Sequence, residues 1–195
     1  MSAKPRWRGG WWSGARRRAS PNFGARPDGF CAELLVVHSI SLPPGVYGGD
    51  AIERLFTNRL DWDAHPYYDT IRGLKVSAHF LIRRDGALVQ FVSCDERAWH
   101  AGVSSWRGRE NVNDFSIGVE LEGLEGEAFE APQYGTLLVL ARALAGRYRL
   151  GAIAGHEHIA PGRKKDPGAK FDWARLVMPL GALGWVLPED VTRRN

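Results

Sequence analysis

The sequence lacks the features that mark membrane and secreted proteins. It has two cysteines in 195 residues, Cys31 and Cys94, which are too few for a disulfide framework and form no C-x-x-C motif. No stretch approaches the roughly 18 apolar residues that a membrane-spanning helix needs. Arg16–Arg18 resemble the start of an export signal, but residues 19–24 after them are not an apolar run. We therefore expect a cytoplasmic protein that does not bind a membrane.

An excess of basic charge is absent outside the N-terminal segment, although the net charge of the chain is +4. Seven of the 26 basic residues and one of the 22 acidic residues lie within residues 1–30, which leaves 19 and 21 beyond it. We interpret residues 1–29 as a basic segment that forms a solvated arm, and we expect no nucleic-acid partner. The main domain is expected over 30–180, followed by a C-terminal tail over 181–195. The seven basic residues are Lys4, Arg6, Arg8, Arg16, Arg17, Arg18 and Arg26.

Apolar periodicity, with no internal repeat, predicts one α/β domain. Residues 33–38 form a short apolar run typical of a strand buried on both faces. Residues 116–122 alternate, so that Ile117, Val119 and Leu121 face one way and Ser116, Gly118, Glu120 and Glu122 the other. A mixed central β-sheet flanked by α-helices follows from this order of elements. The other elements expected are a hairpin over 79–83 and 88–92, helices near 50–60 and over 131–149 with Gly151 as terminator, irregular structure over 61–75, and a helix from about 172.

Ligand-type residues gather in two regions, although none of the six histidines forms an H-E-x-x-H motif. His38 ends the first apolar strand, at the sheet edge where open α/β folds place their sites. The second region is a loop over 155–168, which is rich in proline and glycine and contains His156, Lys164 and Asp166. A zinc site with two imidazoles, one carboxylate and an open water position would fit these two regions.

Four segments, in this order and spacing, resemble the AmpD-type anhydro-muramyl-L-alanine amidases. They are "LLVVHSISLPPG" (34–45), "VSAHFLIRRDGALVQFV" (76–92), "RAWHAGVSSWRGRENVNDFSIGVELEG" (97–123) and "GHEHIAPGRKKDPGAKFDWAR" (155–175). Phage amidase-type lysozymes and animal peptidoglycan recognition proteins are wider relatives. The resemblance runs from about residue 12 to residue 177. It implies the peptidoglycan-recognition/amidase type 2 fold and makes residues 30–180 a zinc amidase domain.

The resemblance also implies the active-site residues and the reaction. His38, His156 and Asp166 would bind Zn²⁺, while Glu120 and Lys164 would be catalytic. The reaction would be hydrolysis of the lactyl amide between 1,6-anhydro-N-acetylmuramic acid and L-alanine, with a soluble anhydro-muropeptide as substrate and no protein partner. Glu122 lies on the same strand face as Glu120, so periodicity alone cannot choose between them. We interpret Glu122 as a partner for a nearby arginine.

Substrate binding is the least specified part of the resemblance. His79 is interpreted as a hydrogen-bonded structural residue and His65 as a surface-loop residue. This chain departs from its relatives in having His158 where Asn or Asp is common. Serine replaces the usual Asn at 39, and Lys and Asn stand at 75 and 111, where relatives often have arginines for stem-peptide carboxylates. The residues assigned to substrate binding are Ser39, Lys75, His100, Ala101 and Asn111.

Three other functions compete with this interpretation. A zinc-free peptidoglycan-recognition module would lack a ligand, commonly the third, yet Asp166 is present here. An autolysin or phage lysin acting on intact wall would require an export route or a lysis system. A nucleic-acid-binding protein would show DNA affinity that falls steeply with salt.

Overall fold

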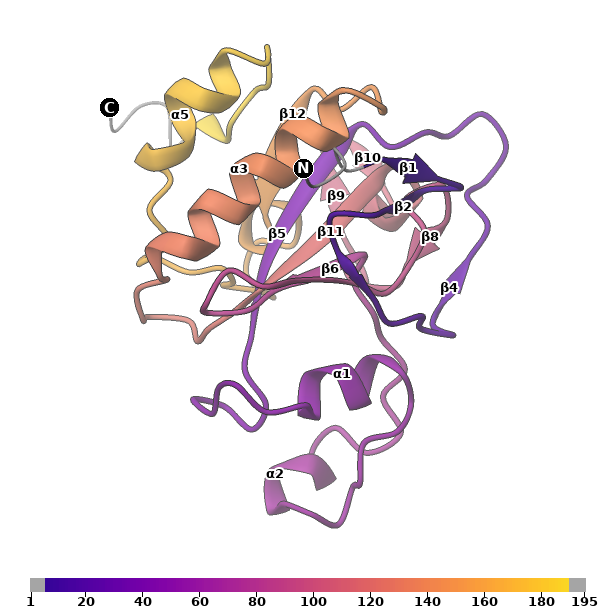
Figure 1. Cartoon of the computed structure of the whole chain (residues 1–195), viewed down its shortest axis with the longest axis vertical. Coiled ribbons are helices and arrows are strands. Elements are labelled where there is room, and N and C mark those ends of the chain that lie inside the picture. Colours follow the sequence, from indigo (N-terminus) through magenta and orange to yellow (C-terminus); the bar gives the residue numbers. More distant parts are fainter. Residues whose placement is uncertain (1–5, 190–195) are drawn as a thin grey trace, which may run out of the picture.

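A six-stranded mixed β-sheet forms the centre of the molecule in the computed structural model, which describes residues 6–189 (Figure 1). The first five residues of the basic segment and residues 190–195 of the C-terminal tail lie outside this description. The β6–β7 pair is antiparallel and the other neighbouring strands run parallel. In sheet order the strands are β12 (Ala152–Gly155), β5 (Leu34–Ile40), β11 (Ser116–Glu122), β6 (Phe80–Ile82), β7 (Leu88–Gln90) and β3 (Arg16–Arg17).

The two long central strands, β5 and β11, are buried on the faces that their sequences predict. On β5, Leu35 and Val37 pack into the main core, whereas Leu34 and Val36 pack into a second core on the opposite face. The strand is therefore buried on both sides, as its uninterrupted apolar sequence predicts. Ile117, Val119 and Leu121 of β11 also belong to the main core, which leaves the polar positions of β11 on the other face.

Helices cover the main-core face of the sheet. Helix α3 (Ala131–Ala145) begins with a capping box between Glu130 and Gln133 and buries Leu137, Leu140 and Leu144 against the sheet. It ends at Gly146, earlier than the predicted terminator Gly151, because the chain must turn back to enter β12. Helix α5 (Ala174–Gly181) packs beside α3 (Figure 1).

A smaller lobe lies below the sheet in Figure 1 and contains α1 (Ala51–Phe56) and α2 (Pro66–Asp69). The helix expected near 50–60 is shorter than predicted, although Leu60 beyond its end still packs in the same apolar cluster. The stretch 61–75 is irregular as expected, apart from the single turn of α2.

The remaining elements of the described chain are short. They are β1 (Trp7–Arg8), β2 (Trp11–Trp12), β4 (Phe23–Gly24), β8 (Arg97–Ala98), β9 (Ser105–Trp106), β10 (Arg109–Glu110), a 3₁₀ turn (Val112–Phe115) and α4 (His156–Ile159).

The basic N-terminal segment is not a solvated arm, which corrects the prediction from charge. Trp12 is buried in the main core, and β3 is the outer strand of the sheet beside β7. Arg26 donates hydrogen bonds of 2.9 Å to the backbone carbonyls of Asp114 and Ser116. Net charge gave no sign of this, because an arginine that binds backbone carbonyls needs no acidic partner.

The start of the predicted C-terminal tail also packs into the domain. Trp185 and Leu187 are buried in the main core. Between them, Val186 forms a parallel bridge with Ala152 of β12. The boundaries at 29 and 180 remain predictions, but described residues on both sides of each boundary share one core. Among residues 6–189, no helix is both long and apolar enough to cross a membrane.

Candidate active site

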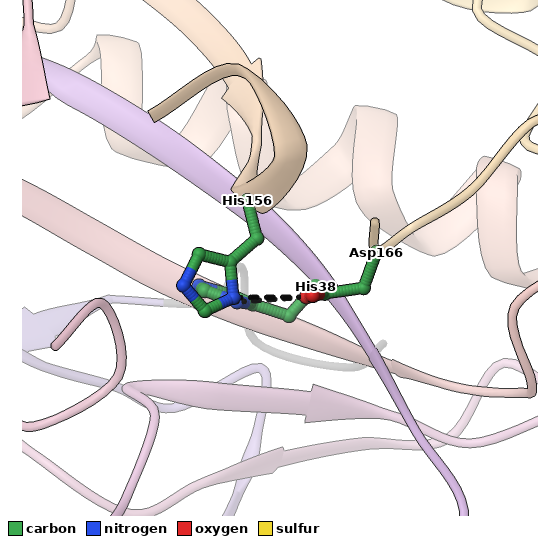
Figure 2. Close-up of side chains that lie close together, drawn as sticks. All are labelled: His38, His156 and Asp166. Atoms are coloured by element: carbon green, nitrogen blue, oxygen red, sulfur yellow. Dashed lines mark hydrogen bonds and ion pairs between the residues drawn. The ribbon is translucent and has the colours of Figure 1, made fainter. Parts of the chain in front are cut away.

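Three ligand-type side chains converge at the carboxyl end of the central strands (Figure 2). His38 lies on β5, His156 is the first residue of α4 directly after β12, and Asp166 lies in the loop that follows. His38 Nδ1 lies 2.9 Å from His156 Nδ1 and 3.2 Å from Asp166 Oδ2, and His156 Nδ1 lies 3.1 Å from the same oxygen. The sequence-predicted ligands therefore form a compact triangle of donor atoms, although they are distant in the chain.

Burial and hydrogen bonding set the protonation of His38 and Asp166. All three residues are buried, with His38 only 1% exposed. Burial lowers the pKa of His38 to about 4, so its imidazole is neutral at pH 7. Burial alone would raise the pKa of Asp166, but hydrogen bonds to His156 and His38 outweigh it and hold the pKa below its ordinary value. A neutral imidazole at His38 and an ionised carboxylate at Asp166 are the forms in which these two groups bind a metal.

The spacing of the three donor atoms fits a cation with tetrahedral coordination. His156 Nε2 donates to the backbone carbonyl of Ala101 at 3.1 Å, which leaves a lone pair on its Nδ1. The ionised carboxylate of Asp166 is also only an acceptor. Ligands held tetrahedrally at about 2.0–2.1 Å from a zinc ion would lie about 3.3 Å apart, close to the 2.9–3.2 Å observed here. Acceptor atoms gathered at these spacings are suited to a shared cation.

Glu120 lies beside this triangle. It is paired with His38 in the parallel register of β11 and β5, so the two side chains emerge at neighbouring positions on one face of the sheet. Its Oε2 is buried and has no hydrogen-bond partner within the described part of the chain. Burial raises the pKa of Glu120 well above its ordinary value, the charge of Asp166 raises it further, and Lys164 opposes them. Such a carboxylate is suited to accept a proton.

An open cleft of about 290 Å³ contains the triangle and Glu120. Its lining also includes Lys164 and several apolar side chains. The sequence did not predict the apolar part of the lining, because residues 61–75 show no periodicity that would indicate a binding surface. The lining residues that sequence reasoning missed are Ile40, Ser41, Leu42, Leu55, Phe56, Tyr67, Ile71, Leu74, Val76, Ser77, Trp99 and Glu125.

Comparison with known proteins identifies the family to which this site belongs. Residues 30–169 match the family described as N-acetylmuramoyl-L-alanine amidase. The chain belongs to this amidase family. The 1,6-anhydro-N-acetylmuramyl-L-alanine amidase AmpD of Citrobacter freundii is 56% identical over 175 residues, which cover 87% of this chain and 94% of that protein. The chain is therefore an AmpD-type member, and its enzymatic activity is that of an N-acetylmuramoyl-L-alanine amidase.

Solved structures of relatives share the fold. The crystal structure of a selenomethionine AmpD derivative superposes with a TM-score of 0.85 at 52% identity, covering 89% of this amidase and 98% of that chain. The Escherichia coli amidase AmiD has a TM-score of 0.56 at 29% identity and covers 90% of this chain and 65% of its own. That structure is a complex with anhydro-N-acetylmuramic acid-L-Ala-D-γ-Glu-L-Lys. The predicted amidase type 2 fold is thus confirmed.

Glu122 has a different environment from Glu120, as its sequence interpretation predicts. It is 2% exposed and accepts a hydrogen bond from Arg83 Nη1 at 2.9 Å. It also accepts from the backbone nitrogens of Gly48 at 2.7 Å and Arg84 at 3.3 Å. All of these contacts join the amidase's loops to the end of β11. Glu122 is a structural ion-pair partner and does not line the cleft.

The two lysines in the loop that contains Asp166 also differ. Both are exposed, but Lys164 lines the cleft and Lys165 does not. The positive charge of Lys164 acts to lower the pKa of His38 and of Glu120, which shows that it is near both. One lysine of this loop therefore lines the cleft, and its neighbour of equal charge does not.

The predicted substrate-binding residues are not all in the cleft. Ser39 and His100 line it. Lys75 and Asn111 are exposed and lie outside the cleft lining. Ala101 is buried, and its carbonyl accepts hydrogen bonds from His156 and Arg163. The assignment of all five residues to substrate binding stays a prediction. The carbonyl of Ala101 instead contacts the ring of His156, a candidate metal ligand.

The other histidines have structural contacts. His79 is fully buried, and its Nδ1 accepts from the backbone nitrogen of Gly118 while its Nε2 contacts the carbonyl of Glu96. It is therefore the structural residue that was predicted. His65 is exposed and caps α2. His158, the departure from the amidase pattern, accepts from the backbone nitrogen of Gly155 and contacts the ring of Trp173.

Proposed function

We propose that this amidase is a zinc-dependent enzyme of peptidoglycan recycling that hydrolyses the lactyl amide between 1,6-anhydro-N-acetylmuramic acid and L-alanine. The observation that carries the proposal is the triangle of His38, His156 and Asp166 beside Glu120, whose buried Oε2 has no hydrogen-bond partner within residues 6–189. AmpD of C. freundii, whose name states this substrate, is similar over 94% of its length.

Zinc is the proposed ion because of the donor set. Two imidazoles and one carboxylate, with room for a fourth ligand, are typical of catalytic zinc sites. His38 and His156 would bind through Nδ1 and Asp166 through Oδ2. A bound zinc ion supplies Lewis-acid polarisation of the amide carbonyl and activates water near neutral pH.

The side chains around this centre divide the remaining work. Glu120 would take the proton of the attacking water and return it to the nitrogen of the departing L-alanine. Its buried Oε2 is suited to this role because no group in the described part of the chain hydrogen-bonds to it. Lys164 would donate to the negative oxygen that develops on the carbonyl. We also propose that Ser39 and His100 border the substrate in the cleft, and that Lys75, Ala101 and Asn111 contribute to its binding although they lie outside the cleft lining.

A product assay tests the function directly. Purified enzyme is incubated with soluble anhydro-muropeptide and with intact sacculi, with and without a chelator, and the products are identified by mass. We expect cleavage of the soluble substrate into anhydro-muramic acid and stem peptide, loss of activity with chelator, recovery with zinc, and one zinc per chain. Protein that contains no zinc and takes up none on reconstitution would contradict the metal assignment. Products from sacculi alone would favour a lysin.

We propose the cytoplasm as the location of the enzyme. Cys31 and Cys94 are both free thiols, which suits a reducing compartment. Fractionation of the native host should recover the full-length chain with cytoplasmic marker proteins. Recovery from the periplasm, shortened near residue 30, would contradict this proposal.

A further inference from the structure

The second nitrogen of His38 begins a chain of hydrogen bonds that leads away from the metal triangle. His38 Nε2 lies 2.9 Å from His100 Nδ1, and His100 Nε2 lies 3.2 Å from the hydroxyl of Ser116. That hydroxyl lies 2.6 Å from the backbone carbonyl of Val112. His156 differs, because its outer nitrogen contacts a carbonyl directly, at Ala101. The outer nitrogen of His38 therefore has an imidazole as its hydrogen-bond partner, whereas the outer nitrogen of His156 has a backbone carbonyl.

A carbonyl can only accept a hydrogen bond, whereas a neutral imidazole has one nitrogen that donates and one that accepts. The contact with His100 would not by itself decide which nitrogen of His38 is protonated. The last hydrogen bond of the series, at Val112, decides which nitrogen is protonated. Because Val112 can only accept, the Ser116 hydroxyl must donate to it, and so it accepts from His100 Nε2–H. His100 Nδ1 then has the lone pair, and His38 Nε2–H donates to it.

The strand beneath His100 is shaped for this ring. A Cβ atom at Gly118 would lie 2.5 Å from Cγ of His100, far inside van der Waals contact. Gly118 belongs to the regular strand β11, so here glycine provides space for the ring. The backbone nitrogens of His100 and Ala101 both donate to the side-chain oxygen of Asn113, at 3.1 and 2.9 Å. Backbone and ring are thus both fixed, and both ring nitrogens are occupied before any substrate arrives.

We propose that His100 is a positioning residue, which with Ser116 holds His38 in the tautomer whose Nδ1 lone pair points to the metal. This inference rests on the proposed zinc site and adds to it a role for two side chains that do not themselves bind the ion. It also revises the sequence-based assignment of His100, whose main contact is with a metal ligand. Outer hydrogen-bond partners of metal-bound histidines typically contribute about 10–100-fold to metal affinity.

Two substitutions at His100 separate its hydrogen bond from its shape. His100→Phe keeps a flat ring over Gly118 but leaves His38 Nε2–H without an acceptor. His100→Asn places a side-chain oxygen near the former Nδ1 position and can restore that acceptor. Zinc affinity of the full-length chain is measured without substrate, by competition with a chromogenic zinc chelator. We expect His100→Phe to bind zinc about 10–100-fold more weakly and His100→Asn to regain most of that loss.

Serine variants supply a matched control in the same region. Ser116 and Ser104 are both buried, and each hydroxyl contacts a backbone carbonyl, but Ser104 does not contact an imidazole. Ser116→Ala should weaken zinc binding and Ser104→Ala should not, with thermal denaturation used to verify folding in each case. If His100→Phe fails to fold, the zinc affinities of Ser116→Ala and Ser104→Ala still test the proposal.

The outcomes distinguish this inference from the proposed function. If the parent protein binds no zinc, the proposed function fails. If the parent binds zinc and folded His100→Phe and Ser116→Ala bind it equally well, the positioning role is wrong. A variant of His100 that raises KM while zinc affinity stays unchanged would likewise overturn it and return His100 to substrate binding.

Discussion

Replacing Glu120 with alanine should leave zinc content unchanged and lower kcat by about 10²–10⁴-fold, the usual contribution of a general acid–base residue. The side chain is absent from the metal triangle, so removing it takes no ligand away. Its buried Oε2 has no hydrogen-bond partner among residues 6–189 to lose, and the fold should therefore tolerate the substitution. Steady-state kinetics on anhydro-muropeptide, together with elemental analysis, measure both quantities.

Glu122→Ala is the matched control, with the same chemical change on the same strand face two residues along. It should retain most of the activity when assayed while folded. Because the partly buried Arg83 loses one of its two carboxylate partners and keeps Glu53, we expect the free energy of unfolding to fall by about 1–3 kcal/mol. Urea denaturation measures that loss. Equal losses of kcat in the two variants would mean that the wrong carboxylate is assigned or that both act together.

Replacing Lys164 with alanine should lower kcat by about 10²-fold or more, with little change in KM or zinc content. A single donor to a developing oxyanion typically contributes about 10²–10³ in rate. The selective effect on kcat follows because this interaction strengthens mainly in the transition state. Lys164 lines the cleft two residues before the proposed metal ligand Asp166, so binding of Asp166 to the ion would also restrict where the lysine side chain can reach.

Lys165→Ala provides the control for charge. Lys165 has the same charge in the same loop, is exposed, and does not line the cleft. Its replacement should have a small effect on kcat. Matching kinetics for the two lysine variants would remove Lys164 from the mechanism and leave it as a charge that balances nearby carboxylates.

The central strands were predictable from local sequence because their environment repeats along the chain. The apolar run of β5 and the alternation of β11 each reflect burial on defined faces, and both strands lie where they were expected. The site was different. His38 and His156 are separated by 118 residues in the sequence. Only the chemistry of their side chains and the family resemblance predicted that they belong to one site. Periodicity could not separate Glu120 from Glu122, whose difference depends on Arg83 from another strand end.

Features that depend on long-range contacts were missed for the same reason. The role of His100 depends on a serine 16 residues away and on the space left by Gly118. Nothing in the segment "AWHAG" specifies these contacts. Trp185 and Leu187 likewise give too short an apolar pattern to indicate burial, although both lie in the main core.

The two ends of the sheet have a consequence for how copies of this protein behave in solution. An uncovered strand edge is a template on which another chain can pair and aggregate. Val186 covers part of β12 at one edge through backbone hydrogen bonds with Gly151 and Ile153. The other edge is β3, a strand of two exposed arginines, which is too short and too charged to recruit a neighbour readily. A fragment cut to the family match at 30–169 would lose both protections and present two bare edges to every other copy.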